Sequence, residues 1–182
     1  MTRTVGVALL WLGLAACSLD YEQLQMAEER DESVPETVIA DAEFTVVRTG
    51  ARSFRISAEQ AETYPERQEQ ILTGLSFEEL GSGDEVITTG RADRAVHETD
   101  TDDVTMSGNI SFYSSEYEAR VTTDYLHWNN EEKLLRGRDD GEVRLELDSG
   151  SVVEGTGFEA DMRRSIARFA QSVQGVLETD EE

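Results

Sequence analysis

The sequence predicts an all-β, single-domain protein in which repeated antiparallel hairpins form a curved roll with an open apolar groove. Three observations lead to this prediction: one hairpin-sized unit recurs along the chain, apolar and polar residues alternate within it, and no segment has an unambiguous helical period. The alternation is clearest over residues 143–147, where Val, Leu and Leu are separated by Arg and Glu. A period of two gives each strand one buried face and one solvated face.

Each repeated unit opens with a small residue and an acidic residue, and it closes with a glycine. The four units are Ala58-Glu59 with Gly74, Ala92-Asp93 with Gly108, Thr123-Asp124 with Gly137, and Ala160-Asp161 with Gly175. Polar residues fill the middle of each unit, so each is predicted to be a strand, a polar turn and a returning strand. The glycines either mark bends where the sheet curves or lie in ordinary turns.

The composition limits the class of ligand. The chain has 182 residues, enough for one domain with a hydrophobic core. Its formal net charge is -23 and its pI is about 4.3. Such an acidic surface is typical of a highly soluble or salt-adapted protein, and it repels nucleic acid and anionic headgroups. An anionic lipid would therefore have to be held by its apolar part.

Residues 1–17 have the pattern of a lipoprotein signal peptide. Arg3 precedes an apolar run that is too short to cross a bilayer, and Leu14-Ala15-Ala16-Cys17 follows that run. Cys17 is the only cysteine, so the sequence excludes an internal disulfide and a thiolate metal cluster. We expect Cys17 to carry acyl chains and to anchor the mature chain to a membrane.

The rest of the chain divides by composition. Residues 18–37 are acidic and polar and are predicted to be a flexible tether, residues 38–177 form the β domain, and residues 178–182 are an acidic tail. Residues 163–177 are ambiguous, because apolar residues recur there at both helical and strand spacing. The register of this segment with the repeats favours a strand.

The sequence contains no catalytic constellation. His97 and His127, the only histidines, lie far apart in unlike contexts. The acidic turn at residues 98–103 lacks the glycine and glutamate of a calcium-binding EF-hand loop. The signatures of hydrolases, phosphate-binding loops and zinc metalloproteases are also absent. We therefore expect a protein that is not an enzyme and that holds no cofactor and no metal.

The alternation assigns one set of apolar residues to the interior of the roll. These are Phe54, Ile56, Leu72, Phe77, Met106, Ile110, Phe112, Leu126, Trp128, Leu135, Val143, Leu145, Leu147 and Phe158. A second set is expected to cluster on one hairpin by cross-strand packing. It consists of Tyr113, Tyr117, Tyr125 and Trp128.

Several of these features together resemble the LptC family of lipopolysaccharide-export proteins. They are the N-terminal anchor, the repeated strand units, Thr122-Thr123-Asp124-Tyr125-Leu126-His127-Trp128, Gly137, the strand at residues 143–147, and Glu154-Gly155-Thr156-Gly157-Phe158-Glu159-Ala160-Asp161. The resemblance covers residues 38–176. Related domains such as LptA and the periplasmic part of LptD share the repeated hairpins, so the anchor and the final Gly-x-Gly segment indicate the subfamily.

The resemblance implies a β-jellyroll with a V-shaped pair of sheets. Its apolar groove would carry the acyl chains of lipopolysaccharide from an inner-membrane LptBFG-like ABC transporter to an LptA-like bridge protein. The interior residues would then touch lipid, and a strand edge at Gly155 and Gly157 would continue the sheet into the partner.

The resemblance also implies a location at the periplasmic face of the inner membrane. Ser18 is not the aspartate that marks inner-membrane retention, which leaves the outer membrane as an alternative. Family members commonly anchor through a transmembrane helix, whereas this chain is predicted to anchor through lipid on Cys17.

A second function fits the same pattern. A structural or protein-binding β-roll lipoprotein would share the anchor and the hairpins without transporting lipid. The two functions differ in whether the interior of the roll is filled by side chains or left open.

Overall fold

The computed structural model describes residues 32–48 and 51–176. Cys17, the signal sequence, most of the predicted tether and the acidic tail lie outside the described residues. All described residues belong to one compact unit, Glu32–Glu182. Among them, no helix is long and apolar enough to cross a membrane.

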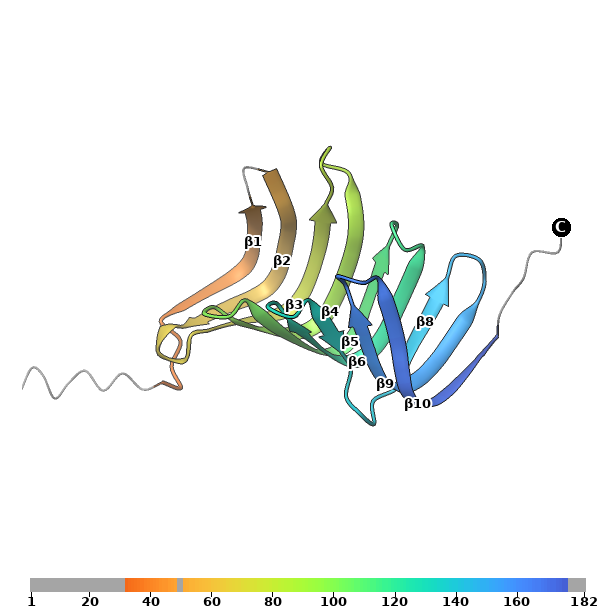
Figure 1. Ribbon diagram of the computed structural model, residues 1–182. Coiled ribbons are helices and arrows are strands. Elements are labelled where there is room, and N and C mark those ends of the chain that lie inside the picture. The colour runs from red at the N-terminus through yellow and green to blue at the C-terminus, as the bar shows by residue number, and fades with distance from the viewer. Residues whose placement is uncertain (1–31, 49–50, 177–182) are drawn as a thin grey trace, which may run out of the picture. The chain divides into compact units, whose positions relative to one another are not determined.

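The described residues form one antiparallel sheet, accompanied by a short 3-10 helix (Figure 1). The strands are β1 (Thr37–Arg48), β2 (Ala51–Tyr64), β3 (Glu69–Leu80), β4 (Val86–Glu98), β5 (Asp103–Ser114), β6 (Ala119–Asn129), β7 (Leu134–Arg136), β8 (Val143–Leu147), β9 (Val152–Asp161) and β10 (Ile166–Val176), and the 3-10 helix η1 is Pro65–Arg67. Their order across the sheet is β1-β2-β3-β4-β5-β6-β7-β9-β10, and β8 pairs with β6 and β9. The all-β prediction is confirmed, and β10 confirms the strand expected near the C-terminus.

The strands β7 and β8 occupy one position in the sheet. β7 pairs with residues 127–129 of β6, and β8 pairs with residues 119–123 of the same strand. A loop at residues 137–142 separates them. The Thr123 hydroxyl donates to the Glu142 carbonyl at 2.8 Å, which fixes one end of this loop. Together β7 and β8 therefore act as a single interrupted strand.

The long strands bend near their middle, so the sheet folds over into two layers (Figure 1). At the bends φ is positive for Asp41 in β1, Gly74 in β3, Gly108 in β5 and Gly157 in β9. The pairing of β4 with β5 shifts register at the same line. Glycine is favoured there because a Cβ is disfavoured at positive φ.

These bends explain the repeated acid-and-glycine unit. The Glu59 side chain lies over Gly74, where an added Cβ would come within 2.6 Å of it. Asp93 lies over Gly108 in the same way, 2.5 Å from an added Cβ. Asn109 also donates its Nδ2 hydrogen to Asp93 Oδ2 at 2.7 Å. The bend alternative is therefore confirmed at these two glycines.

The other two units do not bend at their glycines. Gly137 follows β7 in the loop, where its N–H donates to the Phe158 carbonyl at 2.9 Å. Gly175 pairs with Val153 without a positive φ. The last hairpin bends at Gly157 instead, because the acidic residue of its unit, Asp161, lies at the end of β9 rather than at the fold line.

The strand halves on either side of the fold line define two layers. Layer A consists of residues 37–40, 60–64, 69–73, 94–98, 103–107, 125–129, 134–136, 158–161 and 166–169, and layer B consists of residues 42–48, 51–58, 75–80, 86–92, 110–114, 119–123, 143–147, 152–156 and 171–176. Each layer has an inner face, which is turned toward the other layer.

Two core clusters join the layers. The first contains Ala42, Ala58 and Leu75 of layer B with Ala61, Leu72 and Ala95 of layer A. The second contains Ala92, Ile110, Val121 and Val143 of layer B with Leu126 and Phe158 of layer A. Alanines next to the fold line let the layers approach closely where they meet, because larger side chains would force them apart.

Candidate functional site

An apolar row crosses the inner face of layer B. Its members are directly paired from strand to strand: Phe44, Ile56, Phe77, Gly90, Phe112, Val121, Leu145 and Val153. Paired positions share one face of a sheet, so these side chains form a continuous strip, here called the inner row. Val121 is buried, whereas the other members are only half-buried.

Gly90 is the position in the inner row that has no side chain. The Phe77 ring fills its space, since a Cβ added to Gly90 would lie 2.3 Å from Phe77 Cε1 and 3.1 Å from the Cβ of Phe112. A larger residue at position 90 would displace the ring. The glycine therefore keeps the aromatic part of the inner row flat across β3, β4 and β5.

Exposure of the inner faces increases away from the fold line. In layer A, Leu72 and Leu126 lie close to the fold line and are buried. Val104, Trp128 and Leu135, farther along the same face, are half-buried. Exposure increases in the same way in layer B, from the buried alanines next to the fold line to the half-buried inner row. The apolar interior is thus closed at the fold line and partly accessible away from it.

The predicted interior residues separate into three groups. Leu72, Ile110, Leu126, Val143 and Phe158 are buried, and Phe54, Ile56, Phe77, Met106, Phe112, Trp128, Leu135 and Leu145 are half-buried. Leu147 differs from the prediction, because its side chain is 37% exposed. Leu147 is two residues after Leu145, so the alternation along the strand predicts that it points inward. However, it is the last residue of β8 and lies at the rim of the sheet.

Among the apolar interior residues that sequence reasoning missed, four lie in the inner row or beside the second core cluster. They are Phe44, Val121 and Val153, which belong to the inner row, and Phe169, which packs against the second core cluster. Val121 lies between Arg120 and Thr122, and Phe44 lies between Glu43 and Thr45, so the period of two could have found both. Val153 and Phe169 depend on strand register, which the sequence does not reveal.

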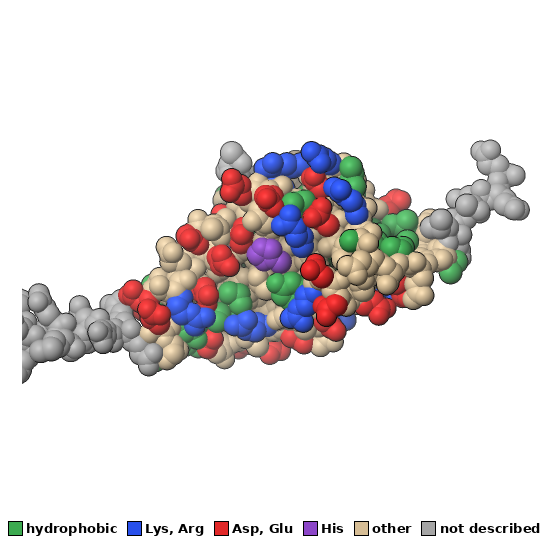
Figure 2. Space-filling view, turned by 60° about the horizontal axis from the view of Figure 1, so that its bottom comes forward, with side chains coloured by type: hydrophobic (Ala, Val, Ile, Leu, Met, Phe, Trp, Pro, Cys, Tyr) green, Lys and Arg blue, Asp and Glu red, His purple; other side chains and the backbone are tan. Residues whose placement is uncertain are grey.

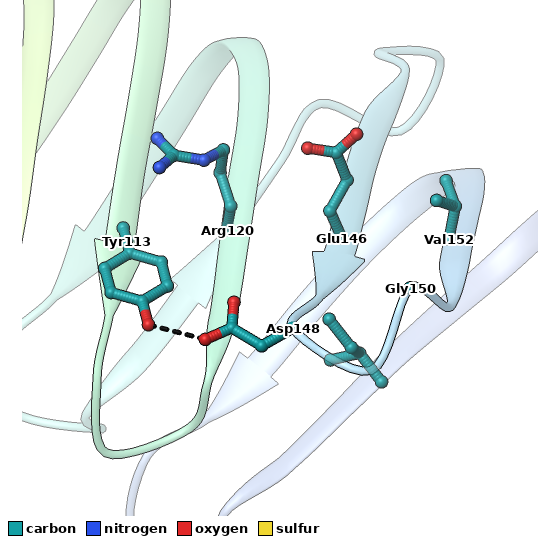
Figure 3. A pocket seen from close by; sticks show the side chains of 7 residues that line it. Tyr113, Arg120, Glu146, Asp148, Gly150 and Val152 are labelled. Carbon is teal, nitrogen blue, oxygen red and sulfur yellow. Dashed lines mark hydrogen bonds between the residues drawn. The ribbon is translucent and has the colours of Figure 1, made fainter. Parts of the chain in front are cut away.

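A small cavity lies on the outer face of layer B. It measures about 230 Å³ and is lined by Tyr113, Arg120, Glu146, Leu147, Asp148, Gly150 and Val152 (Figure 3). Tyr113 follows Phe112 in β5 and therefore points to the opposite face from the inner row. Its hydroxyl donates to Asp148 Oδ2 at 2.7 Å, and this hydrogen bond, with partial desolvation, raises the pKa of Tyr113. The cavity is therefore separate from the apolar interior.

The outer faces are polar. Figure 2 shows acidic and basic side chains interspersed over the face that it presents. On layer B, Arg144 Nη2 lies 2.7 Å from Glu146 Oε1 and also pairs with Glu154. On layer A, Arg136 pairs with Glu132 and Glu159, each at 3.2 Å. These exposed pairs distribute charge along the strands of the outer faces.

The expected aromatic cluster does not form. Tyr113 pairs with Arg120 near one end of the β5–β6 hairpin, and Trp128 pairs with Val104 at the other end. Three of the four rings lie instead beside a cation: Arg120 is 5.4 Å from the Tyr113 ring centroid, Arg138 is 4.5 Å from that of Tyr125, and Lys133 is 5.7 Å from that of Trp128. Tyr117 is 43% exposed. Strand length separates residues that the sequence had suggested as neighbours.

Gly155 and Gly157 do not lie at an edge, so their assignment as a partner edge is wrong. β9 is paired on both sides, with β8 and β7 on one side and β10 on the other. Gly155 makes room for the ring of Phe169, whose Cδ1 would be 2.8 Å from an added Cβ. The strands at the two ends of the described sheet are β1 and β10.

The histidines do not form a site together. His97 Nε2 lies 3.1 Å from Asp102 Oδ1 in the turn that follows β4, and His127 Nδ1 lies 3.0 Å from the Thr105 hydroxyl. Across the described ranges, no group of three or more His, Cys, Asp or Glu side chains is arranged to hold a metal ion.

Two layers of one folded antiparallel sheet, with apolar inner faces and a strand edge at each end of its described part, define a β-jellyroll. A similar fold is seen in the crystal structure of LptH, the LptA-homologous periplasmic component of the conserved lipopolysaccharide transport device from Pseudomonas aeruginosa. The TM-score is 0.53 and the sequence identity 14%, over 69% of this chain and 95% of that chain.

The family model for LptC-related lipopolysaccharide-assembly proteins matches residues 6–178. The chain therefore belongs to the LptC-related family. A comparison with curated proteins found no match.

Proposed function

We propose that the chain is a membrane-anchored, periplasmic component of a lipopolysaccharide-export bridge, and that the acyl chains of the glycolipid lie along the inner row. The observation that carries this proposal is the half-burial of the inner row. Large apolar side chains normally lose most of their exposure on folding, and a row of them that stays partly accessible marks a binding surface. Membership of a lipopolysaccharide-assembly family supports lipopolysaccharide as the ligand.

The chemistry of the inner row suits a sliding hydrocarbon chain. Contact with its aromatic and aliphatic side chains stabilises an acyl chain by about 0.8 kcal/mol per buried methylene. The contribution is spread along the row rather than concentrated at one polar contact. An acyl chain can therefore advance without having to leave a single deep energy minimum. The net charge of -23 disfavours holding the anionic part of the lipid by long-range attraction.

The proposed pathway has three further parts. Acyl chains on Cys17 hold the protein at the periplasmic face of the inner membrane, and residues 18–37 connect this anchor to the β domain. The β domain accepts lipid from an LptBFG-like ABC transporter and passes it to an LptA-like protein. The strands β1 and β10 support transfer at the sheet edges, because each has one described neighbour and carries exposed apolar side chains, including Val38, Ile39, Ile166 and Val173.

Photo-crosslinking in cells tests the position of the lipid. Benzoylphenylalanine at Phe112 or Leu145 places the reactive group on the inner row. We expect these variants to capture lipopolysaccharide, detected as a shifted band that reacts with an antibody against lipopolysaccharide. Thr122 and Glu146 are matched controls, because they lie on the outer faces of β6 and β8, and crosslinkers there are expected to capture no lipid.

The same experiment tests the alternative of a structural or protein-binding lipoprotein. Folded variants that crosslink only to protein at Phe112 and Leu145 would support that alternative and contradict lipid transport. Equal lipid capture at inner and outer positions would contradict the inner row as the binding surface.

A further inference from the structure

We infer that Lys133 and Arg163 form a phosphate-binding site at the rim of layer A, the end of its strands that lies away from the fold line. The site takes a phosphate group of the same lipid whose acyl chains lie along the inner row. The inference therefore rests on the proposed function and adds a headgroup contact to it.

Two neighbouring turns carry the two cations. The turn between β6 and β7 lies beside the turn between β9 and β10, because the Met162 N–H donates to the Lys133 carbonyl at 3.0 Å. The Arg163 guanidinium also donates to the Glu131 carbonyl. Both turns follow strand halves of layer A, at residues 125–129 and 158–161. The fold thus brings an ammonium group and a guanidinium group to one rim.

Lys133 borders the apolar interior. Its Nζ lies 5.7 Å from the centroid of the Trp128 ring, and Trp128 pairs with Val104 and Leu135 on the inner face of layer A. The side chain of Lys133 is half-buried, as expected for an aliphatic stem that packs along apolar surface and a charged head that stays near water. An anion bound by Nζ would therefore lie directly beside the apolar interior.

Within residues 32–48 and 51–176, neither cation is paired with a carboxylate. Nζ of Lys133 donates to Oδ1 of Asn130 at 2.8 Å, and Arg163 donates to a backbone carbonyl. Both of these acceptors are neutral. The ammonium and guanidinium groups therefore retain the capacity for charge-assisted hydrogen bonds to an anion.

Carboxylates on the adjoining strand ends and turns have other partners. Asp103 accepts the Asn130 N–H at 2.8 Å, and Asp161 accepts two backbone N–H groups of the turn that follows it, at 3.0 and 3.1 Å. Glu132 lies 3.2 Å from Arg136. These contacts occupy the acids and leave the two cations available to an external anion.

A lipid that carries phosphate next to its acyl chains fits this arrangement. The guanidinium offers a planar fork to phosphate oxygens, and the ammonium is a compact point charge. The acyl chains lie in the interior, whereas the phosphate stays at the rim because burying its charge is costly. The net charge of -23 acts weakly here, since the Debye length is about 8 Å at 0.15 M ionic strength and the proposed contact is direct.

Acetylation of Lys133 tests the site. Lys133 is the only lysine of the chain, so the mass of one peptide reports on this ammonium group. The full-length protein in detergent is treated with an acetylating N-hydroxysuccinimide ester, either alone, with lipopolysaccharide, or with lipopolysaccharide dephosphorylated by phosphatase. We expect intact lipopolysaccharide to slow the acetylation about fivefold or more near saturation, and the dephosphorylated lipid to slow it much less. Equal protection by the two lipids would overturn the phosphate contact.

A charge variant tests the second cation. Arg163→Gln should raise the concentration of intact lipopolysaccharide that half-protects Lys133 by about tenfold, because one charge-assisted contact is lost. Arg94→Gln is the matched control, since it removes the same charge from an exposed position on the outer face of layer A. It should leave the protection unchanged. Equal shifts in the two variants would show a general charge effect and overturn the site.

Inorganic phosphate separates a lipid headgroup from a free anion as the ligand. At the concentration of the lipid it should leave the acetylation rate unchanged, because it brings no acyl chains to the interior. Protection equal to that by lipopolysaccharide would overturn the assignment to a lipid phosphate.

Photo-crosslinking at Phe112 reports on the proposed function separately. Lipid capture there, combined with no phosphate-dependent protection of Lys133, would contradict this inference alone. Absence of lipid capture at Phe112 would contradict lipid transport as well. The two failures are therefore distinguishable.

Discussion

Single residues set the fold line of this sheet. At Gly108, φ is +78° and an added Cβ would lie 2.9 Å from the Cβ of Asp93. The acid of one strand covers the glycine of the next, which explains why these two residue types recur together. The pairing of Glu59 with Gly74 follows the same rule.

Replacing Gly108 by alanine tests this explanation. We expect Gly108→Ala to lower the free energy of unfolding by about 1–3 kcal/mol, because the new Cβ meets both an unfavourable φ and the side chain of Asp93. Urea denaturation measures the change. Gly83→Ala is the control, since an added Cβ there meets only the flexible end of Glu85, and it should change stability by less than about 0.5 kcal/mol. Equal effects would contradict a special role for the bend.

The predicted anchor also depends on one residue. Cys17→Ala removes the sulfur that we expect to carry lipid, so the protein should move from the membrane fraction to the soluble periplasmic fraction. Immunoblotting of fractionated cells measures the distribution. Ser18→Ala leaves the cysteine in place and should stay with the membrane. Unchanged membrane association of the Cys17→Ala protein would contradict lipid anchoring.

Among the elements, β10 makes fewer stabilising contacts than the central strands do. It pairs with β9 alone, and most of its side chains are exposed. Phe169 is its main contact with the core, with its ring centroid 5.3 Å from that of Phe158. The strand that we propose as an interaction edge is therefore also a strand that the sheet holds from one side only.

Removing the Phe169 ring should release β10 without unfolding the other strands. We expect Phe169→Ala to raise amide hydrogen exchange over residues 166–176 by about tenfold or more, while exchange in β3 to β6 stays unchanged. Phe158→Ala is the comparison, because Phe158 is buried in the second core cluster and its loss should destabilise the whole sheet by about 3–5 kcal/mol. Global exchange in Phe169→Ala would show that β10 is integral to the fold.

At the scale of the whole molecule, charge opposes compactness. The chain has 39 acidic and 16 basic residues. The ion pairs on the outer faces are mostly exposed, and such pairs contribute about 0–1 kcal/mol each. Repulsion among the excess carboxylates therefore outweighs them, and screening by salt should stabilise the folded chain.

Urea denaturation at several salt concentrations tests this balance. Raising ionic strength from about 0.01 M to 0.15 M shortens the Debye length from about 30 Å to 8 Å. We expect the urea midpoint to rise over this range. Choline chloride should have the same effect as sodium chloride, because screening does not depend on a specific cation site. A falling midpoint would show that the exposed ion pairs dominate instead.

The sequence by itself determined the all-β fold, because a period of two in the apolar residues acts locally within each strand. The acid-and-glycine repeat likewise located two of the bends, at Gly74 and Gly108. The bend at Gly157 escaped this reasoning, since the acid of that unit lies at the strand end. The expected aromatic cluster failed for a related reason, because nearness in sequence was taken for nearness across a long hairpin.

The register and the edges were decided only by the tertiary structure. Pairing of Phe44, Ile56, Phe77, Phe112 and Leu145 into one row requires the exact offset of each strand, and that offset is fixed by bends and by contacts between residues far apart in the chain. The edge was misplaced at Gly155 and Gly157 because a local glycine pattern cannot show whether another strand lies beside it. That information depends on the order of strands, which the packing of the two layers decides.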